Sequence, residues 1–235
     1  MALEVADCSS VTNVDWLSID TVLLDMDGTL LDLRFDNNFW LEAIPSAYAK
    51  LNNMSQTEAK AVLAPMFQQQ RGTLNWYCID YWSERLTIDI AKLKRELAHG
   101  VAWRPSAEQF LSHLYKNHCK VILITNAHPE TLKIKLERVD LARWFDALLS
   151  SHSLGAPKES QIFWQALQQQ QPFDPSSTLF IDDSEAVLAA AELYGIAHLF
   201  TLRQPDSRGP IERNTRYPAI HHFDEIDQGL TSNDH

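Results

Sequence analysis

Short apolar runs alternate with amphipathic segments along much of this chain. The runs are strongly apolar, as strands buried on both faces are, and they cover residues 21–24, 120–124, 147–149, 178–181 and 198–202. Segments with helical periodicity lie between them, at residues 107–117, 129–138, 159–170 and 185–194. Alternating strands and helices are typical of an α/β fold. The pattern therefore predicts a doubly wound parallel sheet.

Residues 35–103 follow a different pattern, with helical periodicity and almost no strand signal. Phe39, Ala43 and Ala47 recur at four-residue steps, and Ser55 followed by Glu58 forms a capping-box pattern. The predicted helices cover residues 39–51, 55–66, 73–86 and 90–97. We therefore predict an all-helical cap domain at residues 34–104, inserted into a core domain made of residues 1–33 and 105–235.

The composition is that of an ordinary soluble globular protein, with 45% apolar and 22% charged residues among 235. The net charge of -11 disfavours nonspecific binding to nucleic acid or to anionic membranes. No stretch has the apolar length of a membrane span, and residues 1–20 lack the pattern of a secretory signal. We expect a cytoplasmic protein, as a monomer or small homo-oligomer, with no membrane or nucleic-acid partner.

The cysteines do not point to a disulfide framework or a zinc site. Cys8, Cys78 and Cys119 are odd in number, far apart and without a CxxC spacing. His113 and His118 lie near Cys119, but their spacing on a helix and the chain after it does not hold a tetrahedral set. We therefore expect surface and core roles for these side chains.

Two carboxylates follow the first apolar run. Asp25 and Asp27 would share one face, with Met26 turned to the other, because successive strand side chains alternate. Two acids this close cannot both stay ionised cheaply unless a cation shares them or one keeps a proton. Gly28 lets the backbone turn away at once. The stretch predicts a metal-assisted site with one nucleophilic and one proton-carrying carboxylate.

Polar residues also follow two later strands. Thr125 and Asn126 end the run at 120–124, and Asp182 and Asp183 end the run at 178–181. In open α/β sheets ligands bind at the carboxyl ends of the strands, so we expect these groups to converge on the first acids. Lys158, in a Gly-Ala-Pro-Lys loop before a helix, can join them.

In order and spacing, these motifs resemble those of the haloacid dehalogenase (HAD) superfamily of phosphohydrolases. The matching parts are Asp-Met-Asp-Gly-Thr at 25–29, Thr125, Lys158 and the Asp182–Asp183 pair. The resemblance covers residues 19–30 and 105–200. It implies a Rossmann-like core, and the insertion after the first motif resembles that superfamily's helical type 1 cap.

The resemblance and the residue chemistry assign the same roles. Asp25 is expected to be the nucleophile that forms an aspartyl-phosphate, and Asp27 the general acid and base. Thr125 would bind phosphoryl oxygens, and Asn126 would either do so too or orient the loop. Lys158 would offset negative charge on nucleophile and phosphate.

The same reasoning implies Mg²⁺ as cofactor. Its expected ligands are Asp25, the backbone carbonyl of Asp27, Asp182, and Asp183 either directly or through water. Cleavage of a carbon–halogen bond needs no general acid for its halide leaving group, whereas loss of an alkoxide does. Asp27 therefore favours phosphate esters over haloacids.

The cap is expected to choose the substrate. Most of its aromatic residues should fill its own core, which leaves Asp36, Arg71 and Asn75 as specificity candidates. Residues 32–40 and 71–82 resemble those of the bacterial GMP/IMP nucleotidases of this superfamily, which implies 5′-nucleotidase activity on purine mononucleotides. A sugar-phosphate phosphatase, a phosphomutase and a noncatalytic phosphate-binding regulatory protein stay open as alternatives.

Overall fold

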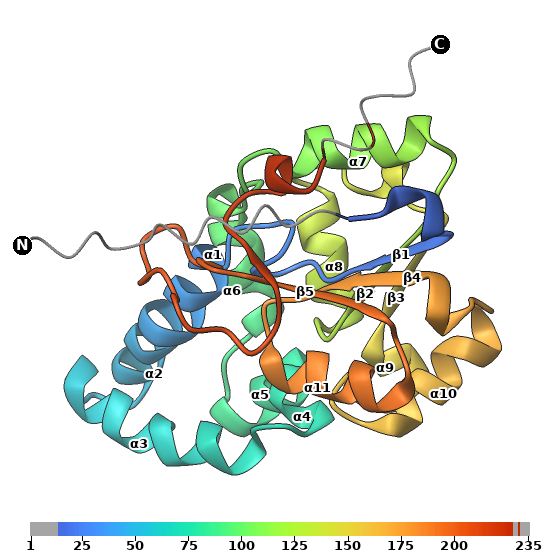
Figure 1. The fold of residues 1–235 in the computed structure, drawn as a ribbon. Helices are drawn as coiled ribbons and strands as arrows, with labels where there is room; N and C mark the ends of the chain where they lie inside the picture. The colour runs from blue at the N-terminus through green and yellow to red at the C-terminus, as the bar shows by residue number, and fades with distance from the viewer. Residues whose placement is uncertain (1–13, 228–229, 231–235) are drawn as a thin grey trace, which may run out of the picture.

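The computed structural model describes residues 14–227 and residue 230 (Figure 1). Cys8 and the rest of residues 1–13, which belong to the segment where no secretory signal was predicted, lie outside the described residues. Among the helices of the described part, none is long and apolar enough to cross a bilayer.

A six-stranded sheet forms the centre of the core, with the order β3-β2-β1-β4-β5-β6 and every pairing parallel. The strands are β1 (Thr21–Leu24), β2 (Lys120–Thr125), β3 (Ala147–Ser150), β4 (Thr178–Ile181), β5 (His198–Leu202) and β6 (Ala219–Ile220). The five predicted strands are confirmed. The sixth was missed because two residues are too short to leave an alternating pattern.

Successive residues of the central strands face opposite sides of the sheet. Val22 and Leu24 pack into a cluster with α7 (Ala107–Lys116), while Leu23 packs into a second cluster with α10 (Gln161–Gln170) and α11 (Glu185–Tyr194). Leu132 of α8 (Pro129–Leu136) joins the first cluster. Both faces of the sheet are thus covered by helices, as a doubly wound fold requires. The short α9 (Ser151–Leu154) lies between the predicted strand at 147–149 and the predicted loop at 155–158, where no helix was predicted.

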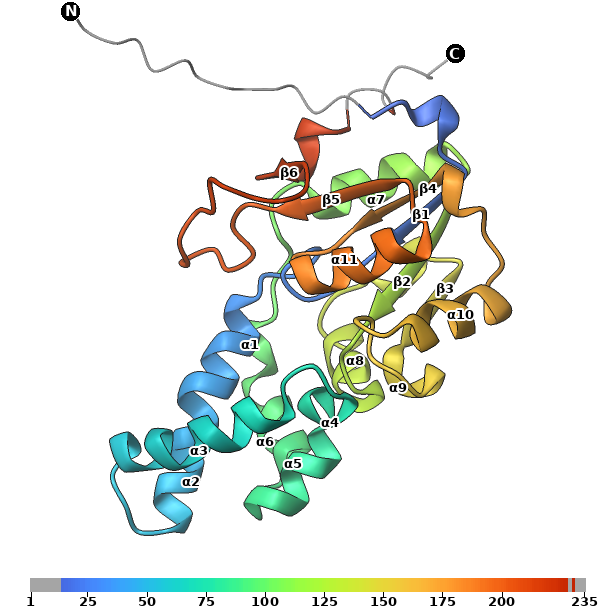
Figure 2. The ribbon, with the colours of Figure 1, turned by 60° about the horizontal axis from the view of Figure 1, so that its bottom comes forward.

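The segment between β1 and α7 is helical and forms a lobe beside the sheet (Figure 2). Its elements are α1 (Arg34–Asn38), a π-helical turn (Phe39–Ala43), α2 (Ile44–Leu51), α3 (Gln56–Gln70), α4 (Leu74–Tyr77), α5 (Ile79–Leu86) and α6 (Ile90–Leu97). The lobe has its own apolar cluster, in which Phe67 and Trp40 each lie edge-on to Trp82. Most of its aromatic residues fill this interior, as expected. The division of the chain into core and cap domains stays a prediction.

Helix boundaries in this lobe differ from the predicted ones, and helical structure begins at Arg34, before the predicted start at residue 39. The predicted helix at 73–86 is two helices, because Cys78 is extended (φ -85°, ψ 106°) and its Sγ accepts a hydrogen bond from Tyr81 N at the start of α5. α3 runs to Gln70, past the predicted end at residue 66, with Pro65 inside it. A capping box of Ser55 and Glu58 begins α3, as predicted.

Residues after β5 pack against the junction of core and cap. Arg104 donates hydrogen bonds to the carbonyl oxygens of Pro205 and His221, each at 3.0 Å. Asn37 Nδ2 donates to Asp206 Oδ2 at 2.7 Å. The tail, in which no element was predicted, therefore supports both crossings of the chain between the lobes.

Candidate active site

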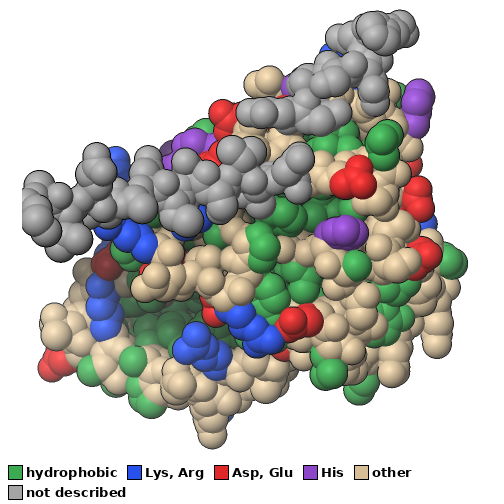
Figure 3. Space-filling model, viewed as in Figure 1, with side chains coloured by type: hydrophobic (Ala, Val, Ile, Leu, Met, Phe, Trp, Pro, Cys, Tyr) green, Lys and Arg blue, Asp and Glu red, His purple; other side chains and the backbone are tan. Residues whose placement is uncertain are grey.

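The carboxyl ends of β1 and β4 bring the first and last acidic motifs together. Asp25 N donates to Ile181 O at 3.1 Å, which continues the β1–β4 ladder by one residue. Met26 packs into the same cluster as Leu24, so Asp25 and Asp27 face the other way, as predicted. Both acids line a cavity of about 720 Å³, and Figure 3 shows a hollow with apolar walls at the junction of the two lobes. Its size suits a small organic ligand.

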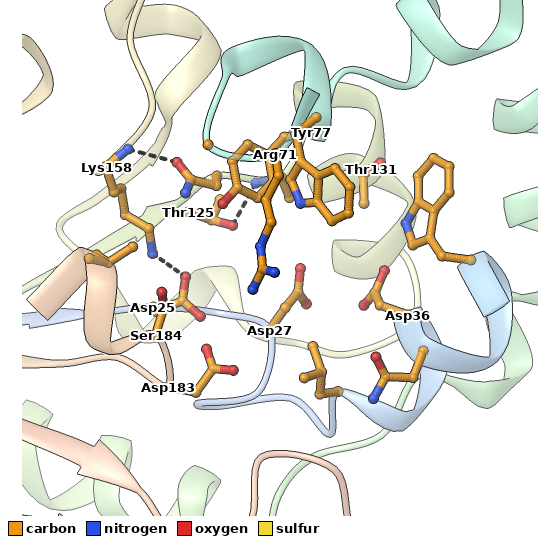
Figure 4. Close-up of a pocket in the computed structure, with 18 of the residues that line it drawn as sticks. Asp25, Asp27, Asp36, Arg71, Tyr77, Thr125, Thr131, Lys158, Asp183 and Ser184 are labelled. Atoms are coloured by element: carbon orange, nitrogen blue, oxygen red, sulfur yellow. Dashed lines mark hydrogen bonds and ion pairs between the residues drawn. The ribbon is translucent and has the colours of Figure 1, made fainter. Parts of the chain in front are cut away.

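Lys158 lies between two of the acids, and Figure 4 shows its contact with one of them, Asp25. Its buried ammonium contacts Asp25 Oδ1 and donates to Asp182 Oδ2 at 2.7 Å and to Ile124 O at 3.2 Å. Burial raises the pKa of Asp25 to about 6 despite Lys158, and Asp182 adds to this rise. Burial alone would lower the pKa of Lys158, but the two carboxylates outweigh it and raise that pKa.

The acids around Asp25 retain uncompensated negative charge. Asp25 Oδ2 is buried without a hydrogen-bond partner in the structure. Asp183 forms no ion pair with any residue of the described ranges, and burial together with Asp182 and Asp25 raises its pKa well above the ordinary value. Oxygen ligands with spare charge suit a hard divalent cation. The donor set therefore fits Mg²⁺, with Asp25, Asp182 and Asp183 as the carboxylates that would hold it.

Gly28 makes room for Asp183. Its backbone has φ +86°, and a Cβ built there would lie 2.5 Å from Asp183 Oδ2. The glycine is thus required both by the left-handed conformation and by the close carboxylate.

Replacing Gly28 with Ala should weaken Mg²⁺ use as well as the fold. Strain at φ +86° should cost about 1–3 kcal/mol, and the added methyl must displace the Asp183 carboxylate. Gly155→Ala is a matched control, because φ there is +75° and no atom lies within 4 Å of the built Cβ. Both variants should unfold at lower temperature, and only Gly28→Ala should need more Mg²⁺ for half-maximal activity. Equal Mg²⁺ requirements would contradict this account.

Thr125 and Asn126 both line the cavity, but the side-chain amide of Asn126 is hydrogen bonded to other protein groups. Its Oδ1 accepts from Lys158 N at 2.9 Å, and its Nδ2 donates to Glu159 Oε2 at 3.1 Å. Of the two roles that the sequence left open, these contacts favour orienting the loop that carries Lys158. Thr125 Oγ1 accepts from Ala127 N at 3.0 Å, which leaves its hydroxyl hydrogen available.

Two buried lysines near the site were missed. Lys135 of α8 contacts Asp27 and donates to Asp36 Oδ2 at 2.5 Å, and Lys94 of α6 donates to Asp36 Oδ1 at 2.8 Å. Burial raises the pKa of Asp27 to about 6, while the two lysines outweigh burial at Asp36 and lower its pKa to about 2. The only hint in the sequence was a lysine on the apolar face of each helix, four residues after Ile90 or Thr131.

The other cap candidates have different positions. Arg71 lies at the end of α3, lines the cavity and points from the cap toward Asp27 (Figure 4). Asp36 lines the cavity too, but both of its oxygens accept from lysines. Asn75 is exposed, hydrogen bonds to Gln70 at 3.3 Å and is not part of the cavity wall. Five aromatic side chains line the cap side of the cavity together with aliphatic and polar residues, and they are Trp40, Phe67, Trp76, Tyr77 and Trp82.

Polar contacts join the helical lobe to the sheet and its helices, one of them at the wall of the cavity. Tyr77 of α4 donates through its hydroxyl to Glu159 Oε1 at 2.6 Å, and burial with Glu159 raises the pKa of this phenol. Arg95 of α6 pairs with Glu130 of α8. The two lobes therefore touch at further points besides the two chain crossings.

Comparison with known proteins places this geometry in context. The family model described as haloacid dehalogenase-like hydrolase matches residues 19–195. The GMP/IMP nucleotidase YrfG of Escherichia coli is 41% identical over 90% of this chain and 95% of its own length. The pyrimidine 5′-nucleotidase YjjG of Escherichia coli is 31% identical over 70% of this chain and 77% of its own length.

A solved structure supports the same fold. A HAD phosphatase from Thermococcus onnurineus superposes with a TM-score of 0.75 at 19% identity, and the match covers 90% of this chain and 98% of the other.

Proposed function

Because this chain belongs to the haloacid dehalogenase-like hydrolases, we propose that it is a phosphomonoester hydrolase that acts as a purine 5′-nucleotidase. Likeness to a GMP/IMP nucleotidase over nearly the whole chain supports the substrate. The observation that carries the chemistry is a buried cluster at the carboxyl ends of β1 and β4, formed by Asp25, Lys158 and Asp182. Purine nucleoside and inorganic phosphate would be the products.

In the first step Asp25 attacks the phosphorus of the substrate and forms an aspartyl-phosphate. Its Oδ2 is the oxygen without a hydrogen-bond partner, while Lys158 holds Oδ1 and so fixes the carboxylate. Asp27 gives a proton to the leaving 5′-oxygen of the nucleoside. Thr125 donates its hydroxyl to a phosphoryl oxygen, and Lys158 offsets the growing negative charge.

In the second step water attacks the phosphorus of the aspartyl-phosphate. Asp27, now ionised, takes a proton from this water, and the Asp25 carboxylate leaves. Lys135 contacts Asp27 and keeps its carboxylate in place on both occasions. Bound Mg²⁺ would supply Lewis-acid stabilisation of phosphoryl charge and lower the repulsion between phosphate and carboxylates. Its ligands would be Asp25, the Asp27 carbonyl, Asp182 and Asp183.

The cap binds the nucleoside in this proposal. A flat purine can lie against the aromatic side chains of Trp40, Trp76 and Tyr77, which line the same cavity as the acids. Arg71, which reaches toward Asp27, adds a positive charge near the phosphate. Asp36 acts through Lys94 and Lys135 rather than on the base, because both of its oxygens are already occupied.

Three alternative functions for a protein of this fold compete with the proposed one. A phosphomutase would return the phosphoryl group to a second sugar hydroxyl and release little phosphate. A sugar-phosphate phosphatase would use the same residues without the aromatic side chains at the cavity. A noncatalytic phosphate-binding protein would lack one of the catalytic groups, and each of them is in place in this chain.

A cytoplasmic location and a monomeric or small oligomeric state stay predictions.

A substrate panel tests the proposed function. Phosphate release should be measured with GMP, IMP, AMP, UMP and several sugar phosphates in the presence of Mg²⁺. We expect GMP and IMP to give the highest kcat/KM. Preference for UMP would move the assignment to pyrimidine nucleotides, and release from sugar phosphates alone would keep the mechanism and reject the nucleotide.

Removal of Mg²⁺ should abolish turnover without unfolding the protein. Excess EDTA should lower phosphate release to the background rate, and added Mg²⁺ should restore it fully. Ca²⁺ should restore little, because its longer and more variable coordination places the phosphate less well. Unchanged turnover after dialysis against EDTA would contradict the assignment of Asp182 and Asp183 as ligands.

A further inference from the structure

Three potential metal ligands that are far apart in the sequence meet where the cap touches the core. Cys78 lies between α4 and α5, His128 begins α8, and His152 lies in α9. One ligand atom from each lies within 4.8 Å of the other two, and all three residues are partly buried. None of them lines the substrate cavity. They are therefore a separate group from the acids around Asp25.

His152 has no hydrogen-bond partner for its ring. Both of its ring nitrogens are buried and unpaired in the structure, although buried polar atoms are normally satisfied. Its ring lies edge-on to that of His128, with the centroids 4.8 Å apart. Burial, with His128 as a second cause, lowers the pKa of His152 to about 4, and burial also lowers the pKa of His128. The unpaired nitrogens of His152 are therefore available to bind a ligand.

We propose that Cys78, His128 and His152 form a binding site for Zn²⁺ or a similar thiophilic cation, with Asp80 as the fourth ligand. Asp80 Oδ2 lies 3.5 Å from His128 Nε2. Corners of a tetrahedron about 2.1 Å from a metal lie roughly 3.4 Å apart, so this pair already has the separation of two ligands. The ligand atoms of Cys78, His128 and His152, which lie within 4.8 Å of one another, would need to move closer by about an ångström, and the exposed Asp80 side chain would turn toward them.

The donor set separates this site from the proposed Mg²⁺ site. A thiolate with two imidazoles suits Zn²⁺, whereas the carboxylates around Asp25 suit a hard cation. The Cys78 thiolate and the Asp80 carboxylate together balance the two charges of the ion. For Nε2 of His128 to bind, its proton moves to Nδ1, which gives up a long hydrogen bond of 3.3 Å from Glu130 N. That bond is weak, so its loss is inexpensive.

A cation at this site would join the cap to the core. Cys78 and Asp80 belong to the α4–α5 segment, while His128 and His152 follow strands β2 and β3 of the sheet. The metal would add to the contact of Tyr77 with Glu159 and restrain the cap in its present position against the core. Because substrate must enter and product must leave past the cap, the ion should slow turnover.

Titration with Co²⁺ tests binding directly. Co²⁺ should be added to the full chain in Mg²⁺ buffer, where one bound equivalent should give a thiolate-to-cobalt charge-transfer band and the visible bands of tetrahedral cobalt. The band should be lost in Cys78→Ser and weakened in His152→Asn. Cys119→Ser is the matched control, since Cys119 is also half-buried with histidine beside it in the sequence. It should keep the full signal.

The spectrum reports sulfur, so binding at the carboxylates around Asp25 cannot imitate it. Absence of the charge-transfer band in the wild type, or its loss in Cys119→Ser but not in Cys78→Ser, would overturn the site. Thermal unfolding of each variant without metal shows whether it folds. If Cys78→Ser does not fold, His152→Asn is the second variant, and it retains the thiol.

The effect of the bound cation on cap movement is measured separately, through turnover. One equivalent of Zn²⁺ should lower the turnover of the wild type in saturating Mg²⁺ several-fold, and Cys78→Ser should resist this. Equal inhibition of both proteins would mean that the cation does not restrain the cap. The same would follow if Zn²⁺ displaced Co²⁺, and so removed the cobalt bands, without lowering turnover. Inactivity of the wild type on every phosphate ester would reject the proposed function, while the Co²⁺ spectrum would still decide the metal site.

Discussion

Asp25→Asn is expected to lower kcat for GMP at least about 10⁴-fold, because an amide cannot form the acyl phosphate. The substitution keeps the shape of the side chain, and the amide oxygen can still accept from Lys158. Lys158 also keeps its bond to Asp182 at 2.7 Å. The effect should therefore be on turnover and not on folding.

Stability of this variant gives a second observable. Burial raises the pKa of Asp25 from 3.8 to about 6, so above that pH the ionised form disfavours the folded state. Removal of that charge should leave the metal-free Asp25→Asn protein at least as stable as the wild type at pH 7.5. Below pH 5, where Asp25 keeps its proton in the fold, this gain should fade.

Asp32→Asn provides a matched control from the same stretch of chain. Asp32 Oδ1 accepts from Arg34 N and Ser207 N, each at 3.0 Å, and an amide oxygen can do the same. This variant should keep its turnover. If Asp25→Asn remained within about tenfold of the wild type, another group would have to be the nucleophile.

Asp27→Asn should have the second-largest effect, with a loss of about 10²- to 10⁴-fold on GMP. The 5′-oxygen of a nucleoside is a poor leaving group and needs the proton of Asp27. p-Nitrophenolate leaves readily without one, so formation of the aspartyl-phosphate from p-nitrophenyl phosphate should be much less impaired.

A burst experiment separates the two steps in this variant. Hydrolysis of the aspartyl-phosphate also uses Asp27, so Asp27→Asn should release about one equivalent of p-nitrophenol quickly and then turn over slowly. Equal loss on both substrates with no burst would mean that Asp27 positions the site instead of moving a proton. Asp32→Asn should show neither effect.

Much of the fold was predictable because its elements leave local patterns. Buried parallel strands are short apolar runs, and β1, β2 and β4 each end in the polar residues of a motif. What could not be predicted depends on contacts between distant segments. The break at Cys78 follows from a backbone turn that the aromatic periodicity of residues 73–86 conceals, and β6 depends on pairing with β5.

The candidate site shows the same division. Asp25, Thr125, Lys158 and Asp182 could be predicted because each lies at the end of a strand, directly after one, or in the loop before α10, at the same edge of the sheet. Lys135 was not, because a buried lysine is recognised only when its partners are known, and these partners are Asp27 and Asp36.

The cap candidates and the cysteine–histidine group show the limits of local signals. Asn75 had the right chemistry and polar neighbours, but the end of α3 and the start of α4 leave it exposed beside Gln70. Cys78, His128 and His152 have no motif spacing, since three separate segments bring them together. Side-chain direction and tertiary contact, which periodicity does not encode, decided these positions.

Chemical trapping of the covalent intermediate tests the central claim most directly. Wild-type protein and Asp27→Asn should be mixed with GMP and Mg²⁺, quenched in acid, reduced with borohydride and digested for mass spectrometry. Reduction converts an aspartyl-phosphate to homoserine. We predict homoserine at position 25 of the wild type only in samples that received GMP. Asp27→Asn should trap more of the intermediate only when p-nitrophenyl phosphate replaces GMP, because formation from GMP needs the proton of Asp27. Phosphate release without any change at position 25, or homoserine at another acid, would contradict the account.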